Sequence, residues 1–383
     1  NVLRNDDGAR LAYQVVVKAD PSDVAATELY AELAAKTPGQ EAEAIGAYRQ
    51  LVRHSPRPSK AVSALVGLLA ARRDYDRAFN AAQVVTFLLG GATSEEQQVV
   101  ARLRKLSRDQ AGRALDDGAW PALLHERLQG PLADIMTLLA LHARPMFVQS
   151  LKDLGLNPKK DEVEVEGSLL FFVNVFKYVS RTLGLRTVRL FRRDDVPSRL
   201  QLVSTEPVGL VVADQMFEER PKKELSFLLA KALAFARPEL FMARLMPHDQ
   251  LDVIFQAACS VGTSKFVVTG DPHLVEKLKR TLEKTLPEPV RKNTLKLLAR
   301  KYTEVQHAGD VRSYMDAAEL TSNRVGALMA GDLDVVRKMI VHEKAQVSKL
   351  REEAQLRDLA LFCLSDEYAA LREKLGLTVV VPG

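Results

Sequence analysis

Apolar residues recur every three or four positions along most of the chain, a spacing that predicts amphipathic helices. The first hundred or so residues also repeat. The pair Ala12-Tyr13 returns 35 residues later as Ala47-Tyr48, and Asp20-Pro21 returns as Ser55-Pro56, while a looser third unit runs from Tyr75 to Phe79. Small residues let two helices approach, an aromatic ring fills the groove beside them and proline ends a helix, so the repeat predicts stacked helix pairs.

This period, with its alanine, aromatic and proline positions, resembles the tetratricopeptide repeat. The resemblance implies an array with a concave face, and Tyr13, Tyr48 and Phe79 lie along its groove. An unrelated helical array is the alternative, and it too gives stacked helix pairs. Thr93 and Glu96 have the spacing of a capping box, which predicts that another helix begins there.

The pattern changes after the stretch from Asn157 to Asp161, which is the best candidate for a linker in the middle of the chain. An apolar helix is predicted for 168–183. Three β-rich runs follow at 187–191, 200–204 and 208–212, and their spacing predicts a small antiparallel or mixed sheet. Further helices are predicted for 223–236, 250–261, 272–286, 288–303, 311–329, 332–341 and 354–375, and a last strand for 378–381.

The run from Val208 to Val212 and the helix that begins near Glu224-Leu225 resemble the core of zinc peptidases of the CAAX-prenyl-endopeptidase type, which are gluzincins. In that family the helix carries H-E-x-x-H, whose histidines bind zinc while the glutamate activates a water molecule. The three motif positions fall on Lys231, Ala232 and Phe235. A protonated lysine cannot ligate zinc, alanine cannot accept a proton and phenylalanine offers no lone pair.

The third ligand of the family comes from a later motif, which Glu319-Leu320-Thr321-Ser322-Asn323-Arg324 resembles. Glu319 keeps the ligand position, and Asn323 replaces an aspartate. The resemblance therefore implies a peptidase scaffold that has lost its metal. We expect Lys231 to pair with Glu319 in place of the metal, the alternative being that both side chains are solvated. The resemblance also implies a peptide-binding edge strand, with Val208, Leu210 and Val212, that would act by β-addition.

Composition adds a few limits. Of the 383 residues 47% are hydrophobic and 27% charged, as in ordinary globular proteins, and the net charge is only +5 with mixed signs, so nucleic-acid binding is not expected. No apolar run is long enough for a transmembrane helix. Cys259 and Cys363 stand in apolar surroundings and are expected in the core, as in a reducing compartment. The chain lacks a starting methionine and a signal peptide, so it is interpreted as a fragment of a longer polypeptide or as cytoplasmic.

The chain contains no phosphate-binding loop, no dinucleotide fingerprint and no nucleophile elbow. His342-Glu343 begins a zinc-like motif, but Gln346 stands where a second histidine is needed. The sequence therefore predicts no catalytic residues, no cofactor and no metal.

The sequence thus predicts a mostly α protein with a tetratricopeptide-like helical array and a smaller α+β domain that resembles an inactive gluzincin peptidase. The predicted parts are repeats at 1–115, a helical connector at 116–160, the degenerate peptidase-like domain at 161–345, and a C-terminal helix and tail at 346–383. We interpret the chain as a non-catalytic scaffold or adaptor in a bacterial regulatory or assembly system, whose partner is a protein that the sequence does not identify.

Two other functions stay open at this point. The first is a residual metal-dependent hydrolase with non-standard ligands drawn from Glu319 and distant histidines. The second is an anion-binding module for nucleic acid or a membrane surface, built on Arg186, Arg189, Arg192, Arg193 and Arg199. The groove of the repeats is either open or filled by the chain's own segment from Gly118 to Leu141.

Overall fold

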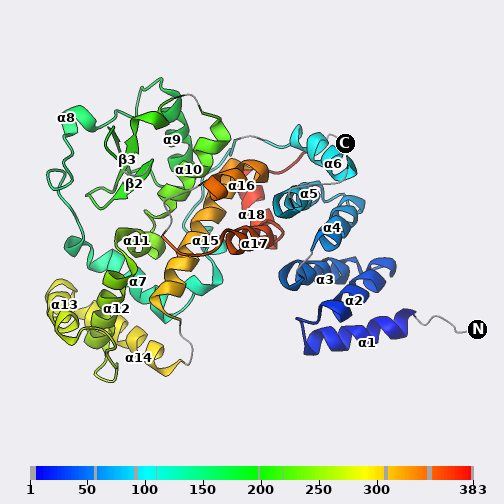
Figure 1. Cartoon of the computed structure of the whole chain (residues 1–383), viewed down its shortest axis with the longest axis horizontal. Helices are drawn as coiled ribbons and strands as arrows, with labels where there is room; N and C mark the ends of the chain where they lie inside the picture. The colour runs from blue at the N-terminus through cyan, green and yellow to red at the C-terminus, as the bar shows by residue number, and fades with distance from the viewer. Residues whose placement is uncertain are drawn as a thin grey trace, which may run out of the picture. The chain divides into compact units, whose positions relative to one another are not determined.

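The computed structural model describes residues 6–55, 58–89, 94–108, 110–196, 199–218, 220–305, 309–342 and 347–380, with residues 89, 95 and 96 described without their side chains. The described part is mostly helical and contains one small three-stranded sheet, which confirms the mostly α class (Figure 1). No helix within these ranges is both long and apolar enough to cross a membrane.

The chain divides into two compact units. Unit 1 contains residues 1–113, 332–337 and 352–383, and unit 2 contains residues 114–331 and 338–351. The C-terminal segment therefore packs with the N-terminal helices, although some 240 residues separate them along the chain. The segment at 114–160, and with it Gly118 to Leu141, belongs to the same unit as the sheet.

Unit 1 begins with helices that pack each against the next along the chain. Alanines occupy the closest contacts, since Ala31 and Ala34 of one helix and Ala44 and Ala47 of the following one are buried. Small side chains allow the helix axes to approach, as the repeat pattern predicts. These helices are α1 (Asp6–Ala19), α2 (Val24–Lys36), α3 (Glu41–His54), α4 (Ser59–Ala71), α5 (Tyr75–Leu89) and α6 (Ser94–Arg104). The predicted capping box lies partly outside the described residues, as does Pro56.

The C-terminal part of unit 1 departs from the prediction. A single helix over 354–375 is wrong, because α17 (Glu352–Cys363) and α18 (Asp366–Leu375) are separate helices. Ser365 breaks the run, and its side chain accepts a hydrogen bond from the backbone nitrogen of Tyr368 at the start of α18. The predicted strand at 378–381 is also wrong for its described residues: the Val379 nitrogen donates to Asp76 and the Val380 nitrogen to the Leu106 carbonyl.

The sheet of unit 2 contains β1 (Arg189–Arg193), β2 (Leu200–Val203) and β3 (Gly209–Ala213), close to the predicted runs. Their order is β1-β3-β2, with β1 parallel and β2 antiparallel to β3, so the sheet is mixed. The edge strand predicted at Val208, Leu210 and Val212 is therefore wrong. β3 is the central strand, it pairs on both sides, and all five of its residues are buried.

Helices α10 (Lys222–Ala234) and α15 (Val311–Ala330) make the most extensive helix–helix contact of unit 2. Gly326 of α15 makes this possible, because a Cβ atom there would lie 2.7 Å from the Phe227 ring of α10. α15 is buried around most of its circumference, as expected of a central helix rather than an amphipathic surface helix.

Of the remaining helices of unit 2, α8 and α9 lie on the side of the sheet, and α7 and α11 to α14 form a separate group away from it (Figure 1). These helices are α7 (Pro131–His142), α8 (Pro158–Asp161), α9 (Phe171–Thr182), α11 (Pro238–Leu245), α12 (His248–Gly262), α13 (Pro272–Thr285) and α14 (Lys296–Glu304). The first half of α16 (Leu333–His342) is assigned to unit 1 and its second half to unit 2. The helix predicted for 288–303 begins with a π-helical turn at Val290–Leu295 before α14. The predicted linker from Asn157 forms α8, whose first turn Asn157 caps.

Candidate functional site

A buried ion pair joins α10 to α15. The ammonium nitrogen Nζ of Lys231 lies 2.6 Å from Oε1 of Glu319, which confirms the predicted pairing of these two side chains. Lys231 is 4% exposed and Glu319 1% exposed, so neither side chain is solvated. A charge so deeply buried needs a partner, because transfer of an isolated ion from water to a protein interior is costly.

The other carboxylate oxygen of Glu319 is also engaged. Oε2 accepts a hydrogen bond of 3.0 Å from the backbone nitrogen of Val347, which lies 28 residues further along the chain. Both oxygens of Glu319 therefore satisfy protein donors, one on α10 and one in the segment that follows α16. We call Lys231, Glu319 and the Val347 amide the ion-pair centre.

A second contact holds the same segment against α15. Ser348 donates its side-chain hydrogen bond to Asp316, one turn before Glu319, and Leu350 donates its backbone nitrogen to Ser348 Oγ. Burial is the main influence on Asp316 and raises its pKa, whereas the bond from Ser348 lowers it. The segment from Val347 to Leu350 is thus attached to α15 at two acidic residues.

The remaining motif positions lie on α10, at its C-cap and on α15. Ala232 is half-buried, Asn323 is buried on α15, and Phe235 is buried at the C-cap of α10, just after the last helical residue. Among the described residues, no group of three or more histidine, cysteine, aspartate or glutamate side chains has an arrangement that could hold a metal ion. His342 is described, but Glu343 to Gln346 lie outside the described residues.

The three predicted groove residues of the array differ in accessibility. Tyr48 and Phe79 are buried among the helices, whereas Tyr13 on α1 is half-buried. Tyr48 and Phe79 are therefore core residues between packed helices and do not line an accessible groove. Their apolar rings serve helix packing, which the repeat pattern alone cannot distinguish from a binding surface.

Part of the array surface is covered by the chain itself. α17 packs against α3 and α5, and Arg357 of α17 donates to the carbonyl oxygens of Val52, Arg53 and Ser55, where α3 ends. Those carbonyls have no partner within the helix, and a guanidinium at that end also interacts favourably with the helix dipole. Within unit 1 the covering element is therefore α17, whereas the segment from Gly118 to Leu141 belongs to unit 2.

A buried ion pair fixes α18 to the array. Arg372 of α18 donates through Nε and Nη2 to both carboxylate oxygens of Asp76 on α5, over 2.8 to 3.3 Å, and is itself buried. Asp366 at the start of α18 accepts from Arg49 and pairs with Arg77. The C-terminal segment is therefore held by charge-assisted hydrogen bonds as well as by apolar packing.

Three of the five candidate arginines near the sheet pair with carboxylates. Arg189 binds Glu162 through two hydrogen bonds, Arg192 binds Asp214 and Arg193 binds Asp195. These carboxylates hold the guanidinium groups along the sheet and cancel their charge locally. The arrangement is that of a solvated, mixed-charge surface rather than a field aimed at phosphates.

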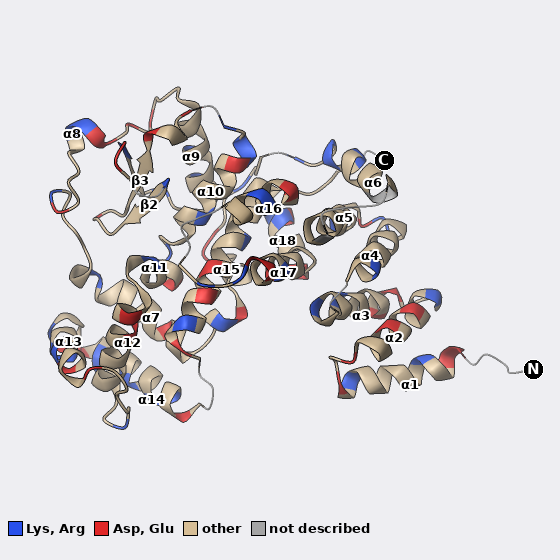
Figure 2. Cartoon of the chain, in the orientation of Figure 1, with Lys and Arg blue, Asp and Glu red and all other residues tan. Residues whose placement is uncertain are grey.

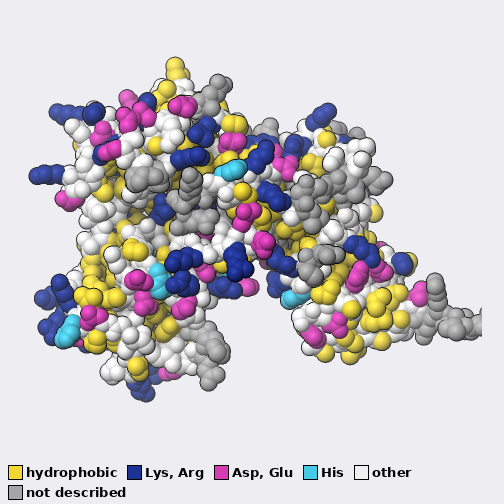
Figure 3. Space-filling view, viewed as in Figure 1, with side chains coloured by type: hydrophobic (Ala, Val, Ile, Leu, Met, Phe, Trp, Pro, Cys, Tyr) yellow, Lys and Arg dark blue, Asp and Glu magenta, His cyan; other side chains and the backbone are white. Residues whose placement is uncertain are grey.

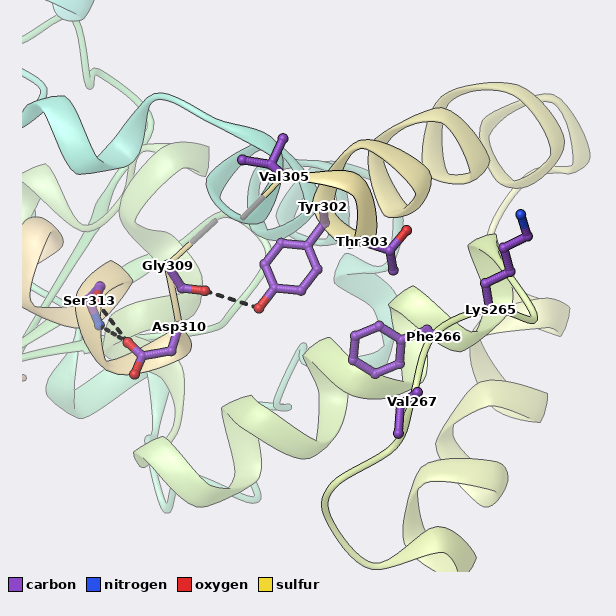
Figure 4. Close-up of a pocket in the computed structure, with 9 residues that line it drawn as sticks. All are labelled: Lys265, Phe266, Val267, Tyr302, Thr303, Val305, Gly309, Asp310 and Ser313. Atoms are coloured by element: carbon purple, nitrogen blue, oxygen red, sulfur yellow. Dashed lines mark hydrogen bonds between the residues drawn. The ribbon is translucent and has the colours of Figure 1, made fainter. Parts of the chain in front are cut away.

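A pocket of unit 2 opens between the loop after α12 and the start of α15 (Figure 4). Its polar groups already have structural roles: the Tyr302 hydroxyl donates to the Gly309 carbonyl, and Asp310 caps α15 by accepting from Ser313. The hydrogen bond from the Ser313 backbone lowers the pKa of Asp310, and burial raises the pKa of Tyr302. Phe266 and Val305 supply an apolar wall, and the Ser313 hydroxyl donates to Asp310 within the cap of α15.

Two exposed apolar surfaces were not predicted. Leu169, Leu170 and Phe171 stand in sequence at the start of α9, and Leu169 is 94% exposed. Leu11, Val15 and Val16 are exposed on α1. In both places the apolar pattern predicts a helix, and only the structure shows that no described residue covers it. Exposed apolar groups that lie side by side are a common sign of a binding surface.

Comparison of the chain with protein-family models, with curated protein sequences and with solved structures gives no match. The functional conclusion therefore depends on the residues and geometry described above.

Proposed function

We propose that this protein is a non-catalytic scaffold or adaptor that binds other proteins, and that unit 2 is a peptidase-like domain that has lost its metal. The observation that carries the proposal is the ion-pair centre. Lys231 and Glu319 stand 88 residues apart, and the motif positions alone selected them as partners. Their direct contact supports the alignment of α10 and α15 with the two halves of a gluzincin site.

The ion-pair centre is unsuited to zinc. A carboxylate ligand must bring an oxygen to about 2.0–2.2 Å from the metal. In this protein the ammonium group of Lys231 lies against one Glu319 oxygen and a backbone N–H points at the other. A divalent cation would have to displace both donors and would face the charge of Lys231.

The two alternatives have less support. A hydrolase with Glu319 as a ligand needs an oxygen that is free to bind, and both oxygens are engaged. An anion-binding module needs unpaired positive charge, and three of the five arginines on the predicted surface pair with carboxylates. Cys259 and Cys363 are buried and form no disulfide with each other, which fits the proposed cytoplasmic location.

Rebuilding the zinc motif tests the scaffold. The variant Lys231→His/Ala232→Glu/Phe235→His would carry H-E-x-x-H on α10 with Glu319 as third ligand. We expect it to bind about one zinc ion per chain, as three protein ligands and a water do in catalytic sites, and to lose the metal with Glu319→Ala. The matched control Ala232→Glu/Phe235→His keeps Lys231 and should bind none. A folded triple variant that binds no zinc would contradict the peptidase resemblance.

Metal content of the unmodified chain tests the absence of catalysis. Protein purified without chelators or a histidine tag, supplemented with zinc and passed through gel filtration, should contain far less than one equivalent by elemental analysis. Zinc near one equivalent that disappears with Glu319→Ala would overturn the non-catalytic conclusion, and peptide hydrolysis would then be measured on the same samples.

A further inference from the structure

Helix α1 buries none of its residues, and its surface divides into two unlike faces. One face is turned toward α2, where Gln14 donates to the Tyr30 hydroxyl and Arg10 donates to Gln40 in the turn that follows. The opposite face carries Leu11, Val15 and Val16, which are 52%, 68% and 42% exposed. Ala12 lies among them at helical spacing, and Asp7 and Lys18 flank this α1 face at its two ends.

The equivalent helix of the next repeat, α3, shows how such an apolar face is buried. At the 35-residue shift, Ala12 and Val16 correspond to Ala47 and Leu51 of α3, and both of these are buried. α3 packs most extensively against α2, the helix that precedes it. Within the described residues, no helix precedes α1 to play the same part. The α1 face is therefore shaped like a helix contact whose partner helix is not among the described residues.

The comparison with α3 also shows that the accessible positions of such a helix need not be large and apolar. Leu11 and Val15 correspond to Gly46 and Gln50 of α3, a small residue and a polar one on its accessible side. α1 thus carries large apolar side chains where the equivalent helix has none. Figure 3 shows hydrophobic side chains gathered over this helix.

We propose that the α1 face binds the α1 face of a second copy of this chain, with the two helices antiparallel. Charge complementarity selects this occupant. The first turn of α1 carries Asp6 and Asp7, the last turn carries Lys18, and all three are exposed (Figure 2). Antiparallel pairing sets the acidic end of each helix against the basic end of the other, and it also opposes the helix dipoles favourably. Parallel pairing would set like charges together.

The size of the surface predicts a modest affinity. α1 has 14 residues and is therefore about 21 Å long. A single helix pair lies at the small end of specific interfaces, so the dimer should form and dissociate with protein concentration. This inference goes beyond the proposed function and does not depend on the peptidase resemblance, because it uses no residue of unit 2.

Light scattering coupled to gel filtration of the full chain over a concentration series is the first test. We expect the mass to rise from one chain toward two as the concentration increases, and Val15→Asp to keep it at one chain. Gln50→Asp changes the equivalent position of α3 and should leave the dimer unaffected. Since Val15 is exposed in the single chain, circular dichroism should show unchanged helix content for both variants. A constant single-chain mass in the unmodified protein would overturn the proposal.

Cross-linking tests the orientation. Ala12 lies next to the midpoint of α1, so Ala12→Cys should meet its counterpart across the two-fold axis and form a disulfide-linked dimer under mild oxidation. Lys18→Cys should not, because antiparallel pairing separates the two copies by about 16 Å along the helix axis. Both native cysteines are buried and should not contribute. Cross-linking of Lys18→Cys as readily as Ala12→Cys would indicate parallel helices and contradict the proposed pairing.

Charge reversal provides an independent check. Lys18→Glu alone should weaken the dimer severalfold, and Asp6→Lys/Asp7→Lys added to it should restore the original midpoint concentration. If the triple variant were no tighter than Lys18→Glu alone, the antiparallel pairing would be excluded.

Discussion

The two residues of the ion-pair centre, Lys231 and Glu319, are far apart in the sequence but in direct contact in the structure. In the proposed peptidase alignment a lysine and a glutamate stand at ligand positions, and in the structure their side chains lie 2.6 Å apart. Such a pair holds α10 and α15 in register, but its desolvation cost offsets much of its Coulombic attraction. Its contribution to stability therefore depends on whether one partner or both are removed.

A double-mutant cycle measures this dependence. Lys231→Met and Glu319→Leu made singly each leave a buried charge without its partner, so each should reduce the free energy of unfolding by about 3–5 kcal/mol. The double variant should lie close to the unmodified protein, except for the lost bond to the Val347 amide. Urea unfolding followed by the fluorescence of Trp120 suits the test, because this single tryptophan is buried in unit 2. Additive single effects would contradict the coupling.

At the scale of elements, helix packing depends on where side chains are absent. Gly326 lets α15 approach the Phe227 ring of α10, and any larger residue would force the two helices apart. Gly67 of α4 is also within a helix, but a Cβ atom there would meet nothing within 4 Å. The two glycines look alike in the sequence and differ only in their neighbours.

Alanine substitution should separate these two glycines. Gly326→Ala should destabilise unit 2 by about 1–3 kcal/mol through overpacking. Gly67→Ala should stabilise unit 1 by about 0.5–1 kcal/mol, because alanine favours the helix and restricts the unfolded chain. Thermal unfolding followed by circular dichroism for the array, and by Trp120 fluorescence for unit 2, distinguishes the two effects. Equal responses at both positions would show that the α10–α15 contact is looser than the structure indicates.

The ion pair between Arg372 of α18 and Asp76 of α5 is a second contact that holds helices together. Arg372 is buried against Asp76, which also accepts the Val379 nitrogen. Arg372→Met should therefore leave Asp76 short of partners and lower the free energy of unfolding of unit 1 by about 3–5 kcal/mol. The exposed pair of Lys60 with Glu28 is the control, since Lys60→Met should cost less than about 1 kcal/mol. Hydrogen exchange of α17 and α18 would show whether the lost stability is confined to these helices. An equal loss of unfolding free energy in Arg372→Met and Lys60→Met would contradict the difference expected between a buried and an exposed ion pair.

At the scale of the whole molecule, each unit presents an apolar surface that its own described residues leave uncovered. In unit 2 this is the sequence Leu169-Leu170-Phe171 at the start of α9. Exposed apolar groups contribute little to the stability of the free chain, so they are the natural place to separate binding from folding.

Substitution of these exposed residues should weaken partner binding without affecting folding. Leu169→Ser/Leu170→Ser should leave the melting temperature unchanged within about 2 °C, because these side chains are mostly solvated. It should reduce severalfold the recovery of partners when the full chain is used as bait. Leu190→Ser, which opens the buried core of the sheet, is the contrasting control and should lower the melting temperature. Unchanged recovery with Leu169→Ser/Leu170→Ser would remove this surface from the proposed function.

The sequence by itself determined the local structure of much of this protein. Periodicity and turn residues fix where most helices and all three strands lie, because these preferences act over a few neighbouring residues. It also determined that Cys259 and Cys363 lie in the core and that Lys231 and Glu319 are the residues to examine in unit 2. The first two conclusions depend on residue type and spacing alone, whereas the choice of Lys231 and Glu319 came from the resemblance to zinc peptidases.

Only the tertiary structure decided which elements meet. The order β1-β3-β2 places the most apolar strand in the centre, where a continuous apolar run is buried on both faces. The packing of 352–383 with the array, the bond from Val347 to Glu319 and the exposure of the α1 face likewise depend on residues far apart along the chain. Whether an apolar face is core or surface depends on long-range contacts, and periodicity describes only the face itself.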